Sequence, residues 1–374
     1  MTAVAPWSEV SLGEICEFKY GKSLPGSRRA SGHVPVYGSN GDVGTHDVAL
    51  TQGPTIIVGR KGSFGEVHYS DVACWPIDTT YYVDQTSTEA DLRWLAYRLS
   101  SMGLTKLNRA ATVPGLNRED AYRERLLVPP LPEQRRIAAI LDQADALRAK
   151  RRAAIAQLDT LAQSIFLEMF GDPVTNPAGW ASHRLAEVAD LENGDRSGNY
   201  PSGDDIKGHG VLFLSTKNIR EGTLDLTTAV YISDDKFASL SRGKARRNDL
   251  VITLRGTLGN CCVFASSHDR AFINAQLLII RPKHGVLPAF LHAVLTSDAS
   301  RARFQRMGSG VAVPQLTSGQ MAELEVPVPS LSFQEEFHRR VAAVHNIKVK
   351  HNSSLHQLDA LLSSLQYRAF RGEL

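Results

Sequence analysis

The sequence predicts an α+β protein in which two strand-rich, mixed globular domains occur in tandem and each leads into a long helix. Three observations support this. A helical stretch at 131–172 returns in a degraded copy at 332–373, and the copies align without a gap at an offset of 200 residues. The segments before these stretches are punctuated by glycine and rich in β-branched residues. Finally, a chain of 374 residues is longer than a domain with a single hydrophobic core usually is.

Both helical stretches carry an apolar seam with alternating three- and four-residue steps, the spacing with which two helices pack lengthwise. The seams share a polar break, at Arg148 and Arg151 in the first copy and at Lys348 and His351 in the second. Each helix is therefore the natural packing partner of the other. The expected packing residues are Ile137, Leu141, Ile155, Leu158 and Ile165 in the first helix and Phe337, Val341, Leu355, Leu358, Leu362 and Leu365 in the second.

The length of the two helices indicates a spacer. Each would extend for roughly 55 to 60 Å, which is longer than a domain needs to bury one helical face. The alternative is that they are unrelated amphipathic helices of one large α/β domain. Residues that keep their register between the copies argue against this alternative, for example Gln134 with Gln334 and Phe170 with Phe370.

Residues 1–128 are expected to form the first globular domain. Short strands joined by tight turns are indicated by VPVYGSNGDVG, TIIVGRKGSFGEVHY and IDTTYYV, and a helix is expected from Glu89 to Met102. Prolines at 129, 130 and 132 then stiffen the approach to the first spacer helix, residues 129–173. Gly171 and Pro173 signal its end.

Residues 174–327 are expected to repeat this domain, and residues 328–374 to form the second spacer helix. Trp7 and Gly21 match Trp180 and Gly194 at an offset of 173, and TIIVGRKGSFGEV resembles DLVITLRGTLGNC. Insertions in the second domain raise the offset to 200, so the domains share a framework but differ in their loops. This pattern suggests two related but distinct ligands held at a fixed separation. DNA suits it, because one helical turn of duplex is about 34 Å.

The composition is that of a soluble globular protein, with 43% hydrophobic and 22% charged residues. The net charge of +3 is only mildly basic and does not by itself indicate a polyanionic partner. The sequence shows no signal peptide and no apolar run long enough for a membrane helix. The four cysteines lack paired CxxC spacing, so we expect a reducing, cytoplasmic environment.

No catalytic or metal-binding constellation is recognisable in the sequence. Gly21-Lys22-Ser23 resembles the end of a phosphate-binding loop, but Cys16 stands where that loop requires glycine. Asn176-Pro177 lacks the second proline and the aromatic residue of an amino-methyltransferase motif. Glu17-Phe18-Lys19 has no upstream Pro-Asp to complete a nuclease site, and the histidines lack ligand spacing.

Three pairs of polar segments are better interpreted as binding residues, because each recurs in both halves. Arginine can bind guanine through two hydrogen bonds, amide side chains can read adenine, and lysine or serine usually holds phosphate. A plain hairpin with solvated charges is the alternative for each turn taken alone. The candidates are Arg60, Lys61 and Ser63 with Arg255 and Thr257 in glycine-rich turns, Ser39 and Asn40 with Lys217 and Asn218 in a second pair of loops, and Lys106, Arg109 and Thr112 with Arg303, Arg306 and Ser309 after a helix.

The chain resembles the DNA-specificity subunits of type I restriction-modification systems over essentially its whole length. The resemblance is carried by Trp7 with Leu12-Gly13-Glu14, the repeated glycine-rich turn, Pro129 to Gln134 before the long helix, Phe170 to Pro173 with Gly179-Trp180, and Phe370 to Leu374. It implies two target-recognition domains, each reading one half of a split, asymmetric DNA sequence. It also implies that the two helices form an antiparallel coiled coil that sets the gap.

The same resemblance implies partners. Two methyltransferase subunits would dock on the helices and bring S-adenosylmethionine, and motor-nuclease subunits that use ATP and Mg²⁺ would join them in some complexes. The chain would itself be non-enzymatic and hold no cofactor and no metal. The family does not fix base-contacting residues position by position, so the binding residues above rest on loop position alone.

Two other hypotheses remain open on the sequence. One is a self-contained nuclease or methyltransferase, which predicts turnover by the purified chain. The other is a coiled-coil adaptor whose two heads bind proteins or glycans instead of DNA. A strong salt dependence of DNA binding would exclude the adaptor, since each neutralised phosphate releases counterions.

Overall fold

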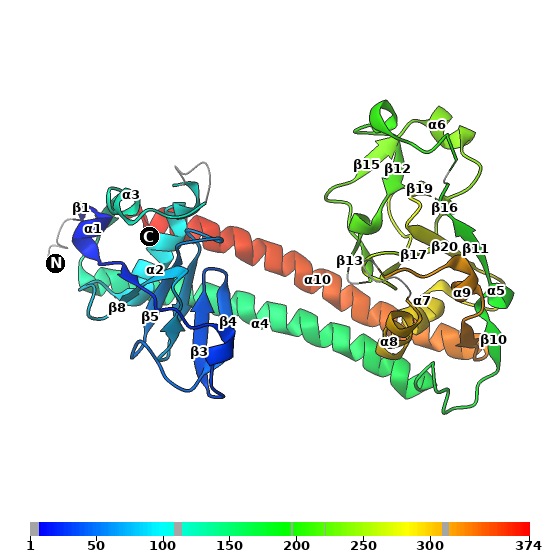
Figure 1. Cartoon of the computed structure of the whole chain (residues 1–374), viewed down its shortest axis with the longest axis horizontal. Helices are drawn as coiled ribbons and strands as arrows, with labels where there is room; N and C mark the ends of the chain where they lie inside the picture. The colour runs from blue at the N-terminus through cyan, green and yellow to red at the C-terminus, as the bar shows by residue number, and fades with distance from the viewer. Residues whose placement is uncertain (1–6, 108–113, 196, 221, 309–313) are drawn as a thin grey trace. The chain divides into compact units, whose positions relative to one another are not determined.

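The computed structural model describes residues 7–107, 114–195, 197–220, 222–308 and 314–374. The chain divides into two compact units, one formed by Met1–Ala153 with His351–Leu374 and the other by Ala154–Lys350. Each unit contains one globular domain and parts of the two long helices, α4 (Leu131–Phe170) and α10 (Leu331–Ala369) (Figure 1).

The first globular domain is built around the antiparallel sheet β2-β8-β5-β6, with a smaller sheet β4-β3-β7 in which β3 and β7 run parallel. Every residue of β5 is buried, because α2 packs on the sheet and supplies Trp94, Leu95 and Leu99 to the core. The elements are β1 (Ser8–Ser11), α1 (Leu12–Ile15), β2 (Lys19–Tyr20), η1 (Gly26–Arg28), β3 (Val34–Gly38), β4 (Gly41–His46), β5 (Thr55–Gly59), β6 (Val67–Ser70), β7 (Trp75–Pro76), β8 (Thr80–Asp84), α2 (Leu92–Ser101), η2 (Leu104–Lys106), α3 (Arg118–Tyr122) and β9 (Arg125–Val128).

The second globular domain repeats this plan with the sheet β11-β20-β17-β18. Its smaller sheet has a fourth strand, in the order β15-β12-β19-β16, and a hairpin β13-β14 is added. The elements are β10 (Ser182–Arg184), α5 (Leu185–Val188), β11 (Ala189–Asn193), η3 (Gly203–Asp205), β12 (Val211–Leu214), η4 (Thr216–Asn218), β13 (Ile219–Arg220), β14 (Thr223–Leu224), β15 (Val230–Ile232), α6 (Asp234–Ser239), β16 (Lys244–Arg246), β17 (Leu250–Thr253), β18 (Cys261–Val263), β19 (Arg270–Ile273), β20 (Leu277–Pro282), α7 (Pro288–Thr296), α8 (Asp298–Met307), α9 (Ser318–Ala322) and β21 (Glu325–Pro327). The predicted tandem repeat of mixed domains is confirmed, and the strands added in the second domain lie in the smaller sheet and in the β13-β14 hairpin.

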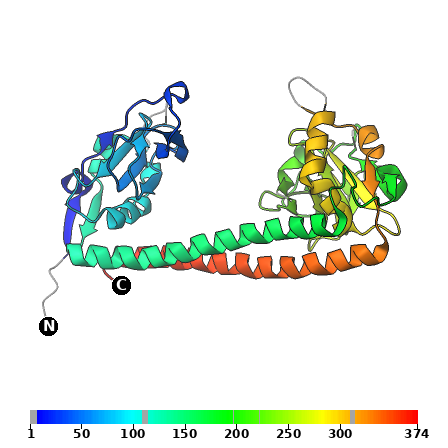
Figure 2. The same cartoon turned by 90° about the horizontal axis from the view of Figure 1, so that it is seen from below.

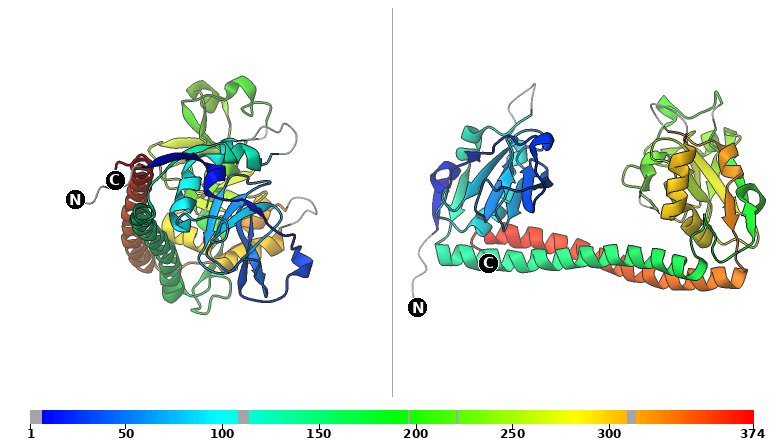
Figure 3. Two further views of the ribbon diagram at one scale, coloured as in Figure 1. Left: turned by 90° about the vertical axis from the view of Figure 1, so that its left-hand side faces the viewer. Right: turned by 60° about the horizontal axis from the view of Figure 1, so that its bottom comes forward.

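The helices α4 and α10 pack against each other in both units (Figures 2 and 3). In the first unit, Ile137 and Leu141 of α4 are fully buried in one core with Leu362 of α10. In the second unit, Phe166 of α4 lies 5.7 Å from Phe337 of α10, measured between ring centroids. Residue numbers rise along one helix as they fall along the other, so the pair is antiparallel, as expected.

The ends of the helices follow local chemistry. α2 begins at Leu92, three residues later than predicted, because the Asp91 carboxylate accepts a hydrogen bond from Trp94 N at 2.9 Å and caps the helix there. α4 ends at Phe170 because Gly171 adopts a φ of +76°, a conformation that glycine tolerates best.

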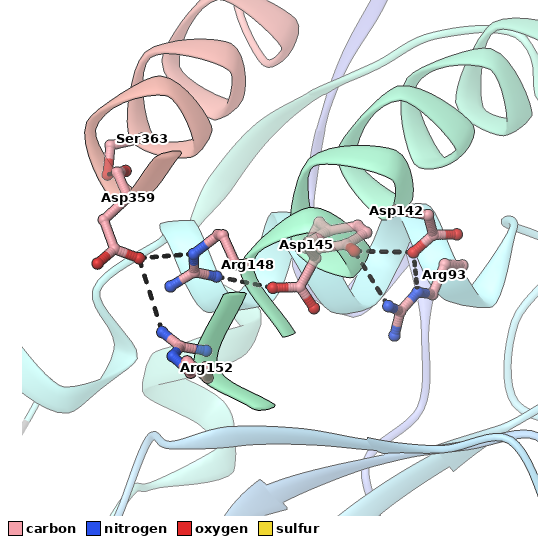
Figure 4. Close-up of polar contacts among 8 residues, drawn as sticks. Arg93, Asp142, Asp145, Arg148, Arg152, Asp359 and Ser363 are labelled. Atoms are coloured by element: carbon pink, nitrogen blue, oxygen red, sulfur yellow. Dashed lines mark hydrogen bonds and ion pairs between the residues drawn. The ribbon is translucent and has the colours of Figure 1, made fainter. Parts of the chain in front are cut away.

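The polar break in the seam consists of paired charges. Arg148 Nε donates to Asp359 Oδ1 at 2.6 Å, and Nη1 of the same residue donates to Asp145 Oδ1 at 2.7 Å (Figure 4). At the repeat-equivalent positions, Lys348 Nζ lies 2.5 Å from Asp159 Oδ1. Partly exposed ion pairs contribute little net stability, but a shift of register would separate half-buried cations from their carboxylates. These pairs therefore favour one alignment of the helices.

A buried glutamine ties each globular domain to the helix that follows it. Gln134 Oε1 accepts from Asp91 N, the N-cap of α2, at 2.8 Å, while Nε2 donates to Pro129 O at 2.9 Å. Gln334 makes the same connection, accepting from Leu287 N, the N-cap of α7, at 2.8 Å. Both side chains are 5% exposed or less. Because hydrogen bonds are directional, these amides fix how each domain sits on its own helix.

Replacing Gln134 by leucine is expected to destabilise the first unit by about 1–3 kcal/mol, since the N–H of Asp91 and the carbonyl of Pro129 would be left buried without partners. Chemical denaturation of the full chain measures this change. Gln143→Leu, the same substitution at an exposed site on α4, is the matched control. Equal unfolding midpoints for the two variants would contradict the role given to Gln134.

Asp359→Asn is expected to destabilise the chain only at higher pH. The hydrogen bond from Arg148 lowers the pKa of Asp359, so the charged carboxylate contributes stability above the unfolded-state pKa of about 3.9. That contribution is lost as the pH falls from this value through the lower folded-state pKa. Unfolding of both proteins at a series of pH values measures the difference, and a difference that persists in acid would refute this assignment.

Candidate nucleic-acid interface

The glycine-rich turn of the first domain joins β5 to β6. Gly62 and Gly65 have φ angles of +74° and +75°, which explains the glycines at these positions. A Cβ at Gly65 would lie 2.4 Å from Thr105 N, so the turn presses directly on the chain that follows α2. Lys61 forms an antiparallel bridge with Gly115, so backbone pairing also joins the turn to a residue further along the chain after α2.

A second loop meets this turn at the carbonyl of Thr79. That oxygen accepts from Arg60 N at 2.8 Å, from Lys61 N at 3.1 Å and from the Ser39 hydroxyl at 2.6 Å. The structure therefore gathers the candidate segments of the first domain around one point: the Ser39–Asn40 loop, the 59–65 turn and the chain after α2.

The side chains gathered there differ in their freedom to bind a ligand. Asn40, Lys61 and Lys106 are exposed and Ser63 is partly exposed, whereas Ser39 is buried and uses its hydroxyl internally. Arg60 Nε and Nη2 donate to Asp78 O at 3.2 and 2.5 Å. Arg109 and Thr112 lie outside the described residues.

The second domain repeats the turn between β17 and β18. Gly259 has a φ of +77°, and a Cβ there would lie 2.5 Å from the Phe304 ring of α8. Arg255 forms a bridge with Gln315, and its Nη2 donates to Gln315 Oε1 at 2.6 Å. Arg255 and Thr257 are exposed. The bridges show that Arg255 is the counterpart of Lys61, which leaves the buried Leu254 as the counterpart of Arg60.

The remaining candidates of the second domain are placed less favourably. Asn218 is 2% exposed; its amide oxygen accepts from Ser215 N at 2.9 Å and its nitrogen donates to Asp225 O at 3.1 Å, so it holds its own loop together. Lys217 beside it is exposed. On α8, Arg306 is exposed and Arg303 is partly buried. Ser309 lies outside the described residues.

Two residues next to the first turn escaped the sequence interpretation. Tyr20 is 52% exposed at the end of β2, and the guanidinium of Arg118, at the start of α3, lies 5.5 Å from the centroid of its ring. Their proximity depends on the pairing of β2 with β8 and on the Lys61–Gly115 bridge, neither of which is visible as a sequence pattern. The only signal was that Tyr20 directly precedes the repeated Gly21.

The described part of the chain shows neither a metal-ligand cluster nor a membrane-spanning helix. Within residues 7–374, apart from the short gaps given above, no group of three or more His, Cys, Asp or Glu side chains could hold a metal ion. No helix in the same residues is both long and apolar enough to cross a membrane.

Comparison with known proteins identifies the family. The family model for the type I restriction modification DNA specificity domain matches residues 5–157 and 177–357. The specificity subunit of the type I restriction enzyme EcoBI from Escherichia coli is 26% identical over 294 residues, covering 71% of this chain and 61% of that subunit. The putative type I specificity subunit S.MpnORF507P from Mycoplasma pneumoniae is 23% identical over 375 residues, covering 95% of this chain and 94% of that subunit. The chain thus spans less than two thirds of the EcoBI subunit.

The fold is also that of a solved structure. The crystal structure of a type I restriction-modification system S subunit from M. genitalium superposes with a TM-score of 0.56 at 16% identity, covering 99% of this chain and 97% of that one. Since the family model matches most of the sequence in two successive segments, the chain belongs to the type I restriction modification DNA specificity family and carries two copies of its domain.

Proposed function

We propose that the chain is the DNA-reading subunit of a type I restriction-modification complex, and that each globular domain reads one half of a split, asymmetric sequence. The observation that carries this proposal is the repeated interface: in both domains a glycine-rich turn with an exposed cation is bridged to the chain after a helix. The specificity family to which the chain belongs supports it. In this proposal residues 1–128 and 174–327 are the target-recognition domains.

The spacer segments, residues 129–173 and 328–374, set the gap between the half-sites. The support is physical: α4 and α10 are continuous helices of 40 and 39 residues, their apolar seam is packed at both ends, and its ion pairs favour one register. A helix of that length extends for about 60 Å, which is close to the length of two turns of duplex DNA.

The helices also dock two methyltransferase subunits, which bring S-adenosylmethionine, and a motor-nuclease subunit that uses ATP and Mg²⁺ joins where one is present. Exposed apolar side chains on both helices support such docking, because a partner that packs on the helices would remove these side chains from water. They are Leu147, Leu161, Leu167, Ile347, Val349 and Leu361. In this proposal the chain itself is non-catalytic and binds neither cofactor, and it acts in the cytoplasm.

Arg255→Ala is expected to weaken recognition of the second half-site and leave the first unchanged. Arg255 and the amide of Gln315 stand side by side at the surface, a pair suited to hydrogen bonding with base edges. Loss of such a contact costs about 1–3 kcal/mol. Binding of the methyltransferase-bound chain to duplexes mutated in one half-site measures the effect.

The control for this variant is Arg247→Ala, which removes the same charge from an exposed ion pair with Asp269 in the same domain. Equal weakening by the two variants, or an effect of Arg255→Ala on both half-sites, would oppose a base-reading role. The adaptor alternative is tested by the same complex: DNA binding that is absent, or insensitive to salt, would favour it over the DNA-reading subunit.

A further inference from the structure

Two guanidinium groups converge on one exposed tyrosine in the first domain. The guanidinium carbon of Arg60 lies 5.2 Å from the centroid of the Tyr20 ring, and that of Arg118 lies 5.5 Å from the same centroid. Both distances are within the range of cation–π attraction. Tyr20 is 52% exposed, so this cluster of Tyr20, Arg60 and Arg118 opens to solvent beside the glycine-rich turn.

The cluster is held by neighbouring aromatic residues. Tyr81 packs edge-on against Tyr20 with 5.1 Å between ring centroids, and its hydroxyl donates to Leu116 O at 3.2 Å. Arg118 also lies over Tyr122, at 5.7 Å, and the Tyr122 hydroxyl accepts from Phe18 N at 2.7 Å. Both supporting rings are thus anchored to the main chain. The cations are presented by a preorganised platform.

The positive charge of the cluster is poorly balanced. Arg60 donates from Nε and Nη2 to the main-chain oxygen of Asp78, a partner without charge. Arg118 Nε is buried and has no hydrogen-bond partner, and its ion pair with Glu119 Oε1 is long, at 3.6 Å, and involves a glutamate side chain that is 63% exposed. A buried donor without an acceptor is unfavourable. An anion bound at this surface would balance both cations.

The second domain provides a comparison within the chain. Asn193, Leu254 and Ser318 stand where the first domain has Tyr20, Arg60 and Arg118. Asn193 Nδ2 donates to Ser318 Oγ at 3.1 Å, so the same elements meet there without any cation. The cationic cluster is therefore a property of the first domain, added to a framework that folds without it.

We propose that Tyr20, Arg60 and Arg118 form a phosphate site of the first domain, which holds a backbone phosphodiester of duplex DNA. The inference rests on the proposed function and adds a ligand and residues to it. Phosphate is favoured over a base edge because two guanidinium groups converge on one exposed ring, and their combined positive charge matches an anionic oxygen better than a neutral base. Such a contact positions the domain on DNA and carries no sequence information.

The test uses the full chain bound to its methyltransferase partner and two duplexes, one containing the split methylation motif and one with its bases scrambled. Arg118→Ala is expected to weaken binding of both duplexes by a similar factor. The slope of log affinity against log salt should become shallower by about one. Arg118→Lys keeps the charge and should retain the slope. The thermal unfolding midpoints of Arg118→Ala and Arg118→Lys show whether the fold of each variant is intact.

Two matched variants serve as controls. Arg123→Ala removes an exposed arginine, paired with Asp120, beside α3, and Ser318→Ala truncates the equivalent position of the second domain; both should retain the wild-type salt slope. An Arg118→Ala chain that binds as the wild type, or that changes base preference at an unchanged salt slope, would overturn the phosphate site. If the wild type binds both duplexes equally, sequence reading fails instead, while a smaller salt slope for Arg118→Ala would still support the phosphate site.

Discussion

The fold depends on the antiparallel packing of α4 against α10. Each globular domain is completed by helix segments from distant parts of the sequence: Ile137 and Leu362 share the first core, and Phe166 and Phe337 share the second. The apolar seam supplies most of the free energy of this packing, because burial of side chains of this size contributes about 1.5–3 kcal/mol each. The ion pairs of Arg148 and Lys348 select the register of the two helices, because both pairs form in only one alignment.

In both globular domains the candidate interface is built in the same way. A fully buried strand ends in a turn whose glycines allow the backbone to fold tightly against the chain after a helix. The turn is thereby fixed by backbone bridges, and its outward side chains are free to differ. Lys61 in one domain and Arg255 in the other occupy the same bridged position, which is how one scaffold can present two chemistries.

The sequence predicted the repeated architecture and the helical pair, because a hydrophobic seam and a gapless repeat are periodic signals. It also located the turns, since glycine at a left-handed position is a strong local constraint. Whether an individual polar side chain is buried or exposed could not be predicted. Asn218 was expected to face a ligand, but it is buried and holds its own loop together. Tyr20 and Arg118, which lie close together, were not predicted. Burial and cross-strand proximity arise from strand pairing, which no local sequence pattern encodes.

We propose that two domains on one helical pair read two half-sites at a set separation. The most direct test is to map methylated bases in the DNA of a host that expresses this chain with its methyltransferase partner and to compare it with a host that lacks the chain. We expect a new split motif with two short half-sites around a gap of constant length. A contiguous motif, or no new motif from an assembled complex supplied with methyl donor, would contradict it.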